Sequence, residues 1–254
     1  MSTVALLIGE RIGYSASPAI HDAAFRALGM PARYELCDVA DGRELERAVE
    51  RVREADCLGA NVTRPHKVAV CDLVDDLSPA VGRIGAANTL VRRGERLLAD
   101  NTDLGAVADE LRALGRFGSA VVLGAGGASR AVQAALADAG TRVRVVDRAH
   151  WHDLAGALRD ADLVVNATPV GTASDESPIP ARLLRADLAV LDLVYRPSPT
   201  RLVREARATG ATARDGAGML LRQAAASFEA WTGCHAPVEA MRAALDDELG
   251  RTDG

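Results

Sequence analysis

A glycine-rich turn between a predicted strand and a predicted helix constrains the fold of this chain most. The apolar run Ser119 to Leu123 predicts a buried strand, and Gly124-Ala125-Gly126-Gly127-Ala128-Ser129 follows it directly. A predicted helix covers Arg130 to Ala139, and a second strand over Val143 to Val146 ends at Asp147. Strand, glycine turn, helix, strand and terminal acid form, in this order, the βαβ fingerprint of dinucleotide-binding domains. The sequence therefore predicts a parallel α/β domain that binds a nucleotide.

The same fingerprint leaves the choice of nucleotide open. Asp147 at the strand end would accept hydrogen bonds from the adenosine ribose hydroxyls and repel a 2′-phosphate, which favours NAD. Arg148 beside it could instead pair with that phosphate. The prediction is NAD, or use of both NAD and NADP.

Two further apolar runs predict that the parallel sheet continues. They cover Asp162 to Asn166 and Leu188 to Val194, and each is followed by a loop containing proline. Such sheets bind ligands at the carboxyl ends of their strands. The loops 167–171 and 195–197 are therefore candidate ligand-binding segments.

Lys67 is the only lysine among the 30 basic residues of the chain. Arginine does not release its proton at any useful pH, whereas a lysine ammonium does, so Lys67 is a candidate acid–base residue. The alternative is a lysine that persists by chance on a solvated face. Cys57 to Val62 predicts a strand, and Pro65 is typical of the first turn of a following helix. In that turn the helix dipole would help Lys67 to give up a proton.

Polar residues gather at the predicted strand ends near Lys67. Asn61 and Thr63 follow one strand and offer hydrogen bonds to a polyol. A hairpin is predicted for residues 89–91 and 96–99, with the turn around Gly94, and it pairs residue 88 with residue 101. Its open end would collect Asn88, Asn101 and Asp103, although Asp103 could instead cap the helix that follows.

A second polar site is predicted where the first helix begins. Ser17-Pro18 predicts a helix start with Ser17 as N-cap, and Ser15 has no such capping role. Two hydroxyls at a helix N-terminus suit a carboxylate ligand.

Asp41 to Glu44 resembles a capping box and is interpreted as architectural. Gln223 lies on a mostly apolar helix, where a solvated role and a functional role are both open.

Composition excludes several classes of protein. A net charge of −5 without a basic, aromatic run argues against nucleic-acid binding. Apolar runs are too short to span a bilayer and the start of the chain lacks a signal-peptide pattern, so a cytoplasmic location is predicted. The four cysteines lack C-x-x-C spacing and the five histidines form no ligand pair, which predicts reduced thiols and no metal.

With these segments in order, the chain resembles the shikimate dehydrogenase family along nearly its whole length. The resemblance implies an N-terminal α/β substrate domain (residues 1–102), completed by C-terminal helices (217–254), and an inserted Rossmann-type parallel-sheet domain (103–216), with a cleft between them. The matching segments are 13–18, 59–67, 85–89, 100–103, 124–130, 166–169, 192–197 and 219–225.

The resemblance also implies roles for individual residues. It assigns Lys67 and Asp103 as the catalytic dyad of a reversible reduction of 3-dehydroshikimate to shikimate by NADP or NAD. Implied ligands of the ring acid are Ser15, Ser17 and Tyr195 at or near its carboxylate, and Asn61, Thr63, Asn88, Asp103 and Gln223 at its hydroxyls. Implied contacts of the cofactor are Gly124, Ala125, Gly126, Gly127, Ala128, Asp147, Arg148, Thr168, Val194, Gly216 and Met219.

Three departures from the family pattern leave the substrate and cofactor open. Tyr14 replaces the usual histidine, Asp147-Arg148-Ala149 replaces an Asn-Arg-Thr type motif, and Thr172 replaces a common methionine. The alternatives are an NAD-dependent quinate, aminoquinate or aminoshikimate dehydrogenase. Outside the enzyme class, a nucleotide-binding sensor that lost turnover is possible, although it would be expected to lack Lys67 or Asp103. The expected partner is a small cyclic polyol carboxylate, without nucleic acid or membrane, and the expected state is a monomer or homodimer.

Overall fold

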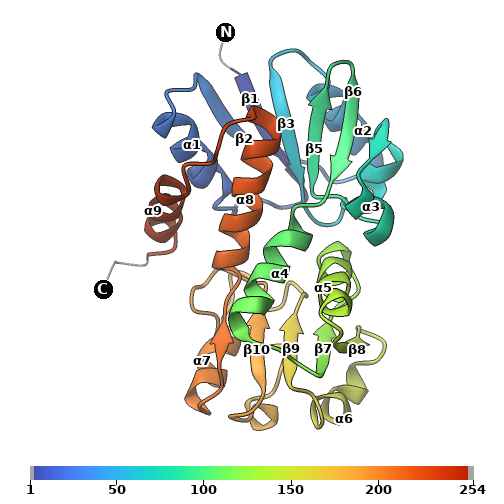
Figure 1. Cartoon of the computed structure of the whole chain (residues 1–254), viewed down its shortest axis with the longest axis vertical. Coiled ribbons are helices and arrows are strands. Elements are labelled where there is room, and N and C mark those ends of the chain that lie inside the picture. Colours follow the sequence, from blue (N-terminus) through green and yellow to red (C-terminus); the bar gives the residue numbers. More distant parts are fainter. Residues whose placement is uncertain (1–2, 251–254) are drawn as a thin grey trace. The chain divides into compact units, whose positions relative to one another are not determined.

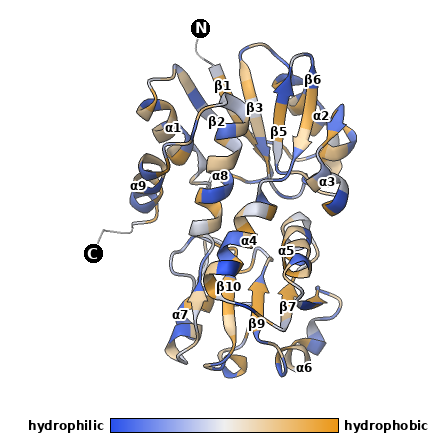
Figure 2. Ribbon diagram, viewed as in Figure 1, coloured by the Kyte–Doolittle hydropathy of each residue, from blue (hydrophilic) through white to orange (hydrophobic). Residues whose placement is uncertain are grey.

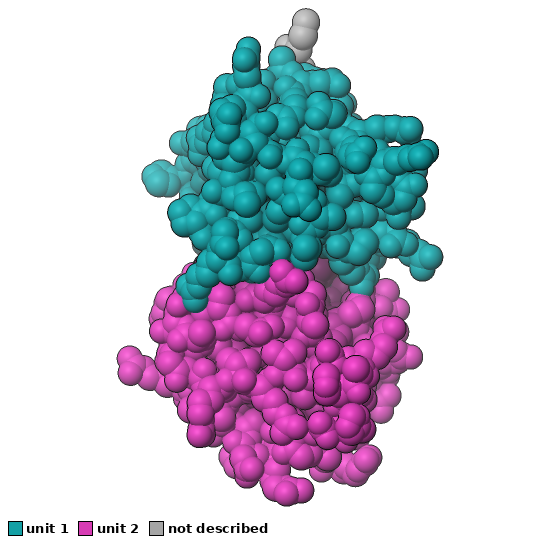
Figure 3. All heavy atoms as spheres, turned by 90° about the vertical axis from the view of Figure 1, so that its right-hand side faces the viewer, with its two compact units in different colours: residues 1–102, 221–254 teal, residues 103–220 magenta. Residues whose placement is uncertain are grey.

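The computed structural model describes residues 3–250, which divide into two compact units (Figure 3). Unit 1 contains Met1–Thr102 and Leu221–Gly254, and unit 2 contains Asp103–Leu220. Each unit has its own sheet and its own hydrophobic core. The predicted α/β class is confirmed.

Unit 1 is built on a mixed six-stranded sheet with the order β2-β1-β3-β5-β6-β4. Strands β1, β2 and β3 are parallel, β5 is antiparallel to β3 and β6, and β4 runs parallel to β6. The N-cap of the capping box predicted before α2 is confirmed, because Asp41 accepts from Glu44 N at 2.9 Å. The Glu44 side chain accepts from Ala40 N at 2.7 Å, one residue before the N-cap. The strands are β1 (Thr3–Gly9), β2 (Ala32–Asp38), β3 (Cys57–Val62), β4 (Asp76–Leu77), β5 (Thr89–Arg93) and β6 (Arg96–Asp100).

Helices cover both faces of this sheet (Figure 1). Val4, Leu6 and Ile8 of β1 share a core with the apolar side of α2, whereas Phe25 of α1 and Phe228 of α8 pack on one another with ring centroids 5.5 Å apart. The helical elements are α1 (Ser17–Ala27), α2 (Gly42–Val52), the 3₁₀ helix η1 (Ala69–Asp72), α3 (Pro79–Ile84), α8 (Ala217–Thr232) and α9 (Val238–Glu248). The first four residues of α8 belong to unit 2.

Unit 2 is a parallel five-stranded sheet with the order β11-β10-β9-β7-β8. Its strands are β7 (Ser119–Leu123), β8 (Arg142–Val146), β9 (Leu163–Asn166), β10 (Ala189–Asp192) and β11 (Ala213–Arg214). Its helical elements are α4 (Asp103–Leu114), α5 (Gly127–Asp138), η2 (Trp151–Asp153), α6 (Leu154–Leu158), η3 (Ala181–Leu183) and α7 (Arg201–Ala208). Helix α5 begins three residues before the predicted start at Arg130.

The strands β7, β9 and β10 are buried on both faces, which explains their near-continuous apolar sequence (Figure 2). Along β7, Val121 and Leu123 pack with α6 and α7, while Ala120 and Val122 pack with α4 and α5. Within residues 3–250, no helix combines the length and the apolar character needed to cross a membrane.

Candidate active site

In unit 1, the strand ends bring several of the predicted site residues to one edge of the sheet. Val62 N donates to Asn88 O at 2.8 Å and Thr63 N donates to Ile8 O at 2.8 Å, so the end of β3 lies against the start of β5. The predicted hairpin register is confirmed, since Thr89 pairs with Asp100. Asn61, Thr63 and Asn88 therefore share this edge.

The side chain of Asn88 is held in a defined orientation at this edge. Its Oδ1 accepts from Thr102 N at 2.7 Å, which fixes the carbonyl side of the amide. Its Nδ2 donates to Thr102 Oγ1 at 2.9 Å and to Gln223 Oε1 at 3.4 Å. Gln223, on α8, is thus brought to Asn88 across 135 residues of sequence. Asn101 donates from Nδ2 to Ala86 O at 2.8 Å and is committed to the preceding loop.

Lys67 does not lie in the first turn of a helix, which corrects the prediction. Residues 64–68 form turns, and only the 3₁₀ helix η1 at Ala69–Asp72 follows. The β-branched Val68, Val70 and Val74 lower helix propensity here. A helix dipole is therefore not available to assist proton release by Lys67.

Backbone contacts hold Lys67 at the strand-end edge instead. Ala87 N donates to Lys67 O at 2.7 Å, which ties Lys67 to the loop before Asn88. The neighbouring His66 is buried, and its Nε2 is 2.8 Å from Val39 O. The half-buried Lys67 is therefore held by its own backbone contact to Ala87 and by the contact of the neighbouring His66 to Val39.

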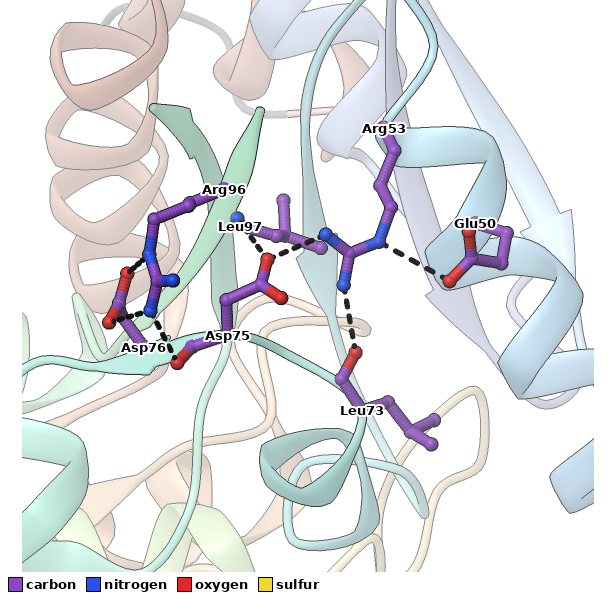
Figure 4. Close-up of polar contacts among 7 residues, drawn as sticks. All are labelled: Glu50, Arg53, Leu73, Asp75, Asp76, Arg96 and Leu97. Carbon is purple, nitrogen blue, oxygen red and sulfur yellow. Dashed lines mark hydrogen bonds and ion pairs between the residues drawn. The ribbon is translucent and has the colours of Figure 1, made fainter. Parts of the chain in front are cut away.

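Ion pairs anchor the chain that continues from Lys67 (Figure 4). Asp75 accepts from Arg53 Nη1 at 2.6 Å and from Leu97 N at 2.7 Å, and Asp76 accepts from Arg96 Nε at 2.7 Å. The hydrogen bond from Arg53 is the main cause that lowers the pKa of Asp75. These contacts join the segment after Lys67 to α2 and to β6.

The predicted carboxylate site differs from expectation in one respect. Ala16, not Ser17, is the N-cap of α1, and it makes no side-chain capping bond. Ser15 Oγ accepts from Ser17 N at 3.2 Å, so the capping role expected of Ser17 falls to Ser15. The physical reason is that Ala16 already has helical dihedrals, which moves the free N–H groups one residue earlier along the chain.

The loop that carries Ser15 contacts the loop that carries Lys67. Arg64 Nη2 donates to Tyr14 Oη at 3.1 Å, and the guanidinium lies 5.5 Å from the centre of the Tyr14 ring. The departure from the family pattern at residue 14 is therefore part of a contact between two site loops.

Unit 2 contains the remaining predicted residues. Asp103 is the first residue of α4 and is buried, with 4% of its surface exposed. Tyr195 is half-buried in the loop after β10.

Thr168 follows β9, where its hydroxyl donates to Asn166 Oδ1 at 2.6 Å. Gly216 N donates to Val194 O at 3.0 Å, which joins two segments predicted to contact the cofactor. Met219, near the start of α8, is buried against the core of α4 and β10.

The glycine turn of unit 2 fits a dinucleotide. Gly124 has φ of +99°, and a Cβ there would lie 3.1 Å from Ala167 O, so the loops after β7 and β9 touch where the strand order reverses. Gly126, which precedes α5, has φ of −79°, and the space that a Cβ would occupy there is open. Neither backbone nor packing requires glycine at position 126. An open approach to a helix N-terminus is what a pyrophosphate needs.

Asp147 is already engaged by its own loop. Its Oδ1 accepts from Ala149 N at 3.0 Å, from His150 N at 3.1 Å, and lies 2.7 Å from His150 Nδ1. The hydrogen bond from the His150 side chain is the main cause that lowers the pKa of Asp147. The Asp147 carboxylate, which would repel a 2′-phosphate, thus has the His150 imidazole as a partner. This contact was not predicted from the sequence. The i, i+3 spacing of Asp147 and His150 was the available signal.

A buried carboxylate joins the ends of β9 and β10. Asp192 accepts from Asn166 Nδ2 at 2.8 Å and Val194 N at 3.0 Å through Oδ1, and from Thr200 Oγ1 at 2.8 Å through Oδ2. Burial raises the pKa of Asp192 to about 6 despite these bonds. This carboxylate therefore fixes the loops that carry Thr168 and Val194.

The raised pKa of Asp192 predicts a pH-dependent stability. The folded chain holds this proton up to about pH 6, whereas the unfolded chain releases it near 3.8. The associated stability is complete below pH 3.8 and is lost as the pH rises through 6, a change of about 3 kcal/mol. In denaturant unfolding, the stability of Asp192→Asn relative to that of the original protein should therefore increase between about pH 4 and pH 7.

The exposed Asp162 provides a control of opposite sign. Backbone N–H groups, that of Ser119 foremost, lower the pKa of Asp162. Its contribution is present above the unfolded pKa and is lost as pH falls, so Asp162→Asn should lose most stability at neutral pH. A stability difference for Asp192→Asn that stays constant from about pH 4 to pH 7 would contradict the assignment.

Comparisons with known proteins agree with one another over most of the chain. Family models match residues 7–90 (shikimate dehydrogenase substrate binding domain) and residues 216–245 (shikimate 5′-dehydrogenase C-terminal domain). A shikimate dehydrogenase (NADP(+)) of Natronomonas pharaonis is 45% identical, with 96% of this chain and 98% of the relative covered.

Solved structures also resemble this chain. Shikimate 5-dehydrogenase from Thermus thermophilus, in complex with NADP(H) and shikimate, has a TM-score of 0.87 and 37% identity, and the match covers 97% of this chain and 100% of that chain. Quinate dehydrogenase from Corynebacterium glutamicum, in complex with NAD, has a TM-score of 0.84 and 30% identity, with 97% and 99% covered.

Proposed function

Because this chain belongs to the shikimate dehydrogenase family, we propose that it catalyses the reversible, nicotinamide-dependent reduction of 3-dehydroshikimate to shikimate. The observation that carries the proposal is the placement of the single lysine. The backbone carbonyl of Lys67 accepts from Ala87 N, in the residue before Asn88, and Asn88 in turn contacts Gln223. A lysine on the loop next to amides that are proposed to bind hydroxyls suits a secondary alcohol that must lose or gain a proton.

The residues of the chain take separate roles in this reaction. Lys67 removes the hydroxyl proton in the oxidation and returns a proton to the developing alkoxide in the reduction. Asp103 is the second member of the dyad. Ser15, Ser17 and Tyr195 recognise the carboxylate, and Thr63, Asn88 and Gln223 recognise ring hydroxyls. The nicotinamide ring, when bound, supplies or accepts the hydride.

The cofactor of the proposal is NADP or NAD, bound at the glycine turn of unit 2. The open approach at Gly126 and the start of α5 support a pyrophosphate there. The His150 partner of Asp147 reduces the repulsion between this carboxylate and a 2′-phosphate, and Arg148 follows in the chain. This pairing supports NADP alongside NAD.

Quinate or an amino analogue is the second candidate substrate. It is favoured by Tyr14, which replaces the usual histidine of the family and contacts Arg64 of the Lys67 loop. The proposal further includes a cytoplasmic protein that acts as a monomer or homodimer and binds no nucleic acid.

Initial rates of nicotinamide reduction test the function. Shikimate and quinate are each paired with NAD and NADP, and absorbance reports turnover. We expect shikimate to be preferred, and the better cofactor shows whether Asp147 or the groups around it dominate. A preference for quinate would move the assignment to the second candidate. Cofactor binding without turnover on any cyclic polyol acid would favour a nucleotide-binding sensor.

A further inference from the structure

A cluster of uncharged polar side chains is buried beneath the strand-end edge of unit 1. It consists of Tyr34, Asn61, Thr89 and Ser227, and is called here the amide cluster. Each is at most 5% exposed. Tyr34 Oη donates to Asn61 Oδ1 at 2.9 Å, and Asn61 Nδ2 donates to Ser227 Oγ at 2.9 Å. Buried polar groups are costly unless they are paired, so this network fixes a single arrangement.

Counting hydrogens shows which groups the Asn61 amide hydrogens reach. Ser227 has one hydroxyl hydrogen, and Gln223 O accepts it at 2.9 Å. Ser227 Oγ can then only accept, and it does so from Asn61 Nδ2 at 2.9 Å. Thr89 Oγ1 also lies 2.9 Å from Ser227 Oγ, and its single hydrogen has both Ser227 Oγ and Asn88 Oδ1 as acceptors. The second Asn61 hydrogen has Asn88 O at 3.2 Å and Thr89 Oγ1 at 3.3 Å as acceptors. Asn61 therefore has no amide hydrogen to spare for a ring hydroxyl.

The amide cluster is continuous with Asn88. Asn61 Nδ2 reaches the main-chain carbonyl of Asn88, and Thr89 Oγ1 lies 3.1 Å from Asn88 Oδ1. Asn88 in turn contacts Gln223, whose carbonyl accepts the Ser227 hydroxyl. Asn88 and Gln223, both assigned to ring hydroxyls, are therefore joined to these buried residues.

An aromatic stack holds the tyrosine of the amide cluster in place. The His21 ring is parallel to Tyr34 at a centroid distance of 4.4 Å, and Trp231 lies 5.2 Å from His21. His21 is fully buried, its ring nitrogens have no hydrogen-bond partner among residues 3–250, and burial lowers its pKa to about 3. The stack is thus neutral and places no charge beside Asn61.

We propose that Tyr34 and Ser227 are positioning residues for the ring acid, and that Asn61 positions Asn88 rather than donating a hydrogen bond to a ring hydroxyl itself. The proposal rests on the proposed function. Tyr34 and Ser227 hold opposite ends of the Asn61 carboxamide, so removing either contact leaves one end of it less firmly held. Loss of either contact would loosen Asn88 and Gln223 in the substrate site and leave the cofactor site of unit 2 unchanged.

Tyr34→Phe and Ser227→Ala test the proposal through KM and kcat. We expect each to raise the KM for shikimate about fivefold to tenfold, the scale of one neutral hydrogen bond, with kcat within about threefold. The KM for the nicotinamide cofactor should stay within about twofold. The double variant should raise KM by less than the product of the single effects, because both changes act on one carboxamide.

Thr232→Val is the matched control on α8. Thr232 Oγ1 donates to Phe228 O at 2.8 Å, the same i−4 contact that Ser227 makes, but outside the amide cluster. It should leave every KM unchanged. If the original protein is active and Tyr34→Phe has an unchanged KM for shikimate, the proposal is wrong. The same holds if Tyr34→Phe has a lower melting temperature but an unchanged KM. If the original protein turns over neither shikimate nor quinate, the proposed function and this inference both fall. If Ser227→Ala does not fold, Tyr34→Phe alone decides.

Discussion

Lys67→Arg is expected to lower kcat by about 10²–10⁴-fold, the contribution of a positioned acid–base group. The guanidinium keeps the positive charge but does not release its proton, so the hydroxyl of the ring acid has no base. Folding should be unaffected, because Lys67 is half-buried and its fixed contacts to Ala87 and Cys71 use the backbone carbonyl. The KM for shikimate should change much less than kcat. Steady-state kinetics with a thermal melt measures both.

Arg93→Lys is the control for this exchange. Arg93 is exposed at the end of β5 beside the hairpin turn, so an arginine–lysine swap there should leave kcat and melting temperature unchanged. Turnover of Lys67→Arg within about threefold of the original protein would remove Lys67 from the mechanism. If the thermal melt shows that Lys67→Arg is destabilised as well as inactive, Lys67→Met is measured in its place.

Much of the fold was predictable because its signals are local. The βαβ unit was read from a glycine turn between apolar runs, and β7, β8 and α5 confirm it. The hairpin register followed from the position of its turn, and the pairing of Thr89 with Asp100 confirms it. Periodicity and turn residues act over a few positions, so one sequence contains them.

Features that depend on distant segments were not predictable. Ser227 contacts Asn61 across 166 residues, and its helix showed only an apolar face with Gln223 on it. Where local signals were weak they misled: Pro65 suggested a helix start, but the valines that follow support only one 3₁₀ turn. The roles of Lys67, Asp103 and the other site residues came from the family resemblance, and these assignments stay predictions.

Gly216→Ala is expected to destabilise unit 2 by about 3 kcal/mol, as overpacking against a rigid neighbour does. A Cβ at Gly216 would lie 2.2 Å from Leu193 O and 2.6 Å from Leu193 C, both backbone atoms that cannot rotate away. The segment must shift, which breaks the 3.0 Å bond from Gly216 N to Val194 O. Thermal unfolding should show a midpoint lower by roughly 10 °C. The cofactor KM should rise as well, since Val194 is displaced with its loop.

Gly126→Ala is the matched control, and it should separate folding from cofactor binding. A Cβ at position 126 meets no atom within 4 Å, and φ of −79° suits alanine. The melting midpoint should therefore stay the same or rise slightly, because alanine reduces the entropy of the unfolded chain. The cofactor KM should nevertheless rise about tenfold, since the methyl group occupies the approach of a pyrophosphate to the start of α5. An unchanged cofactor KM would place the dinucleotide elsewhere, and a large loss of stability would show that this turn needs glycine for folding.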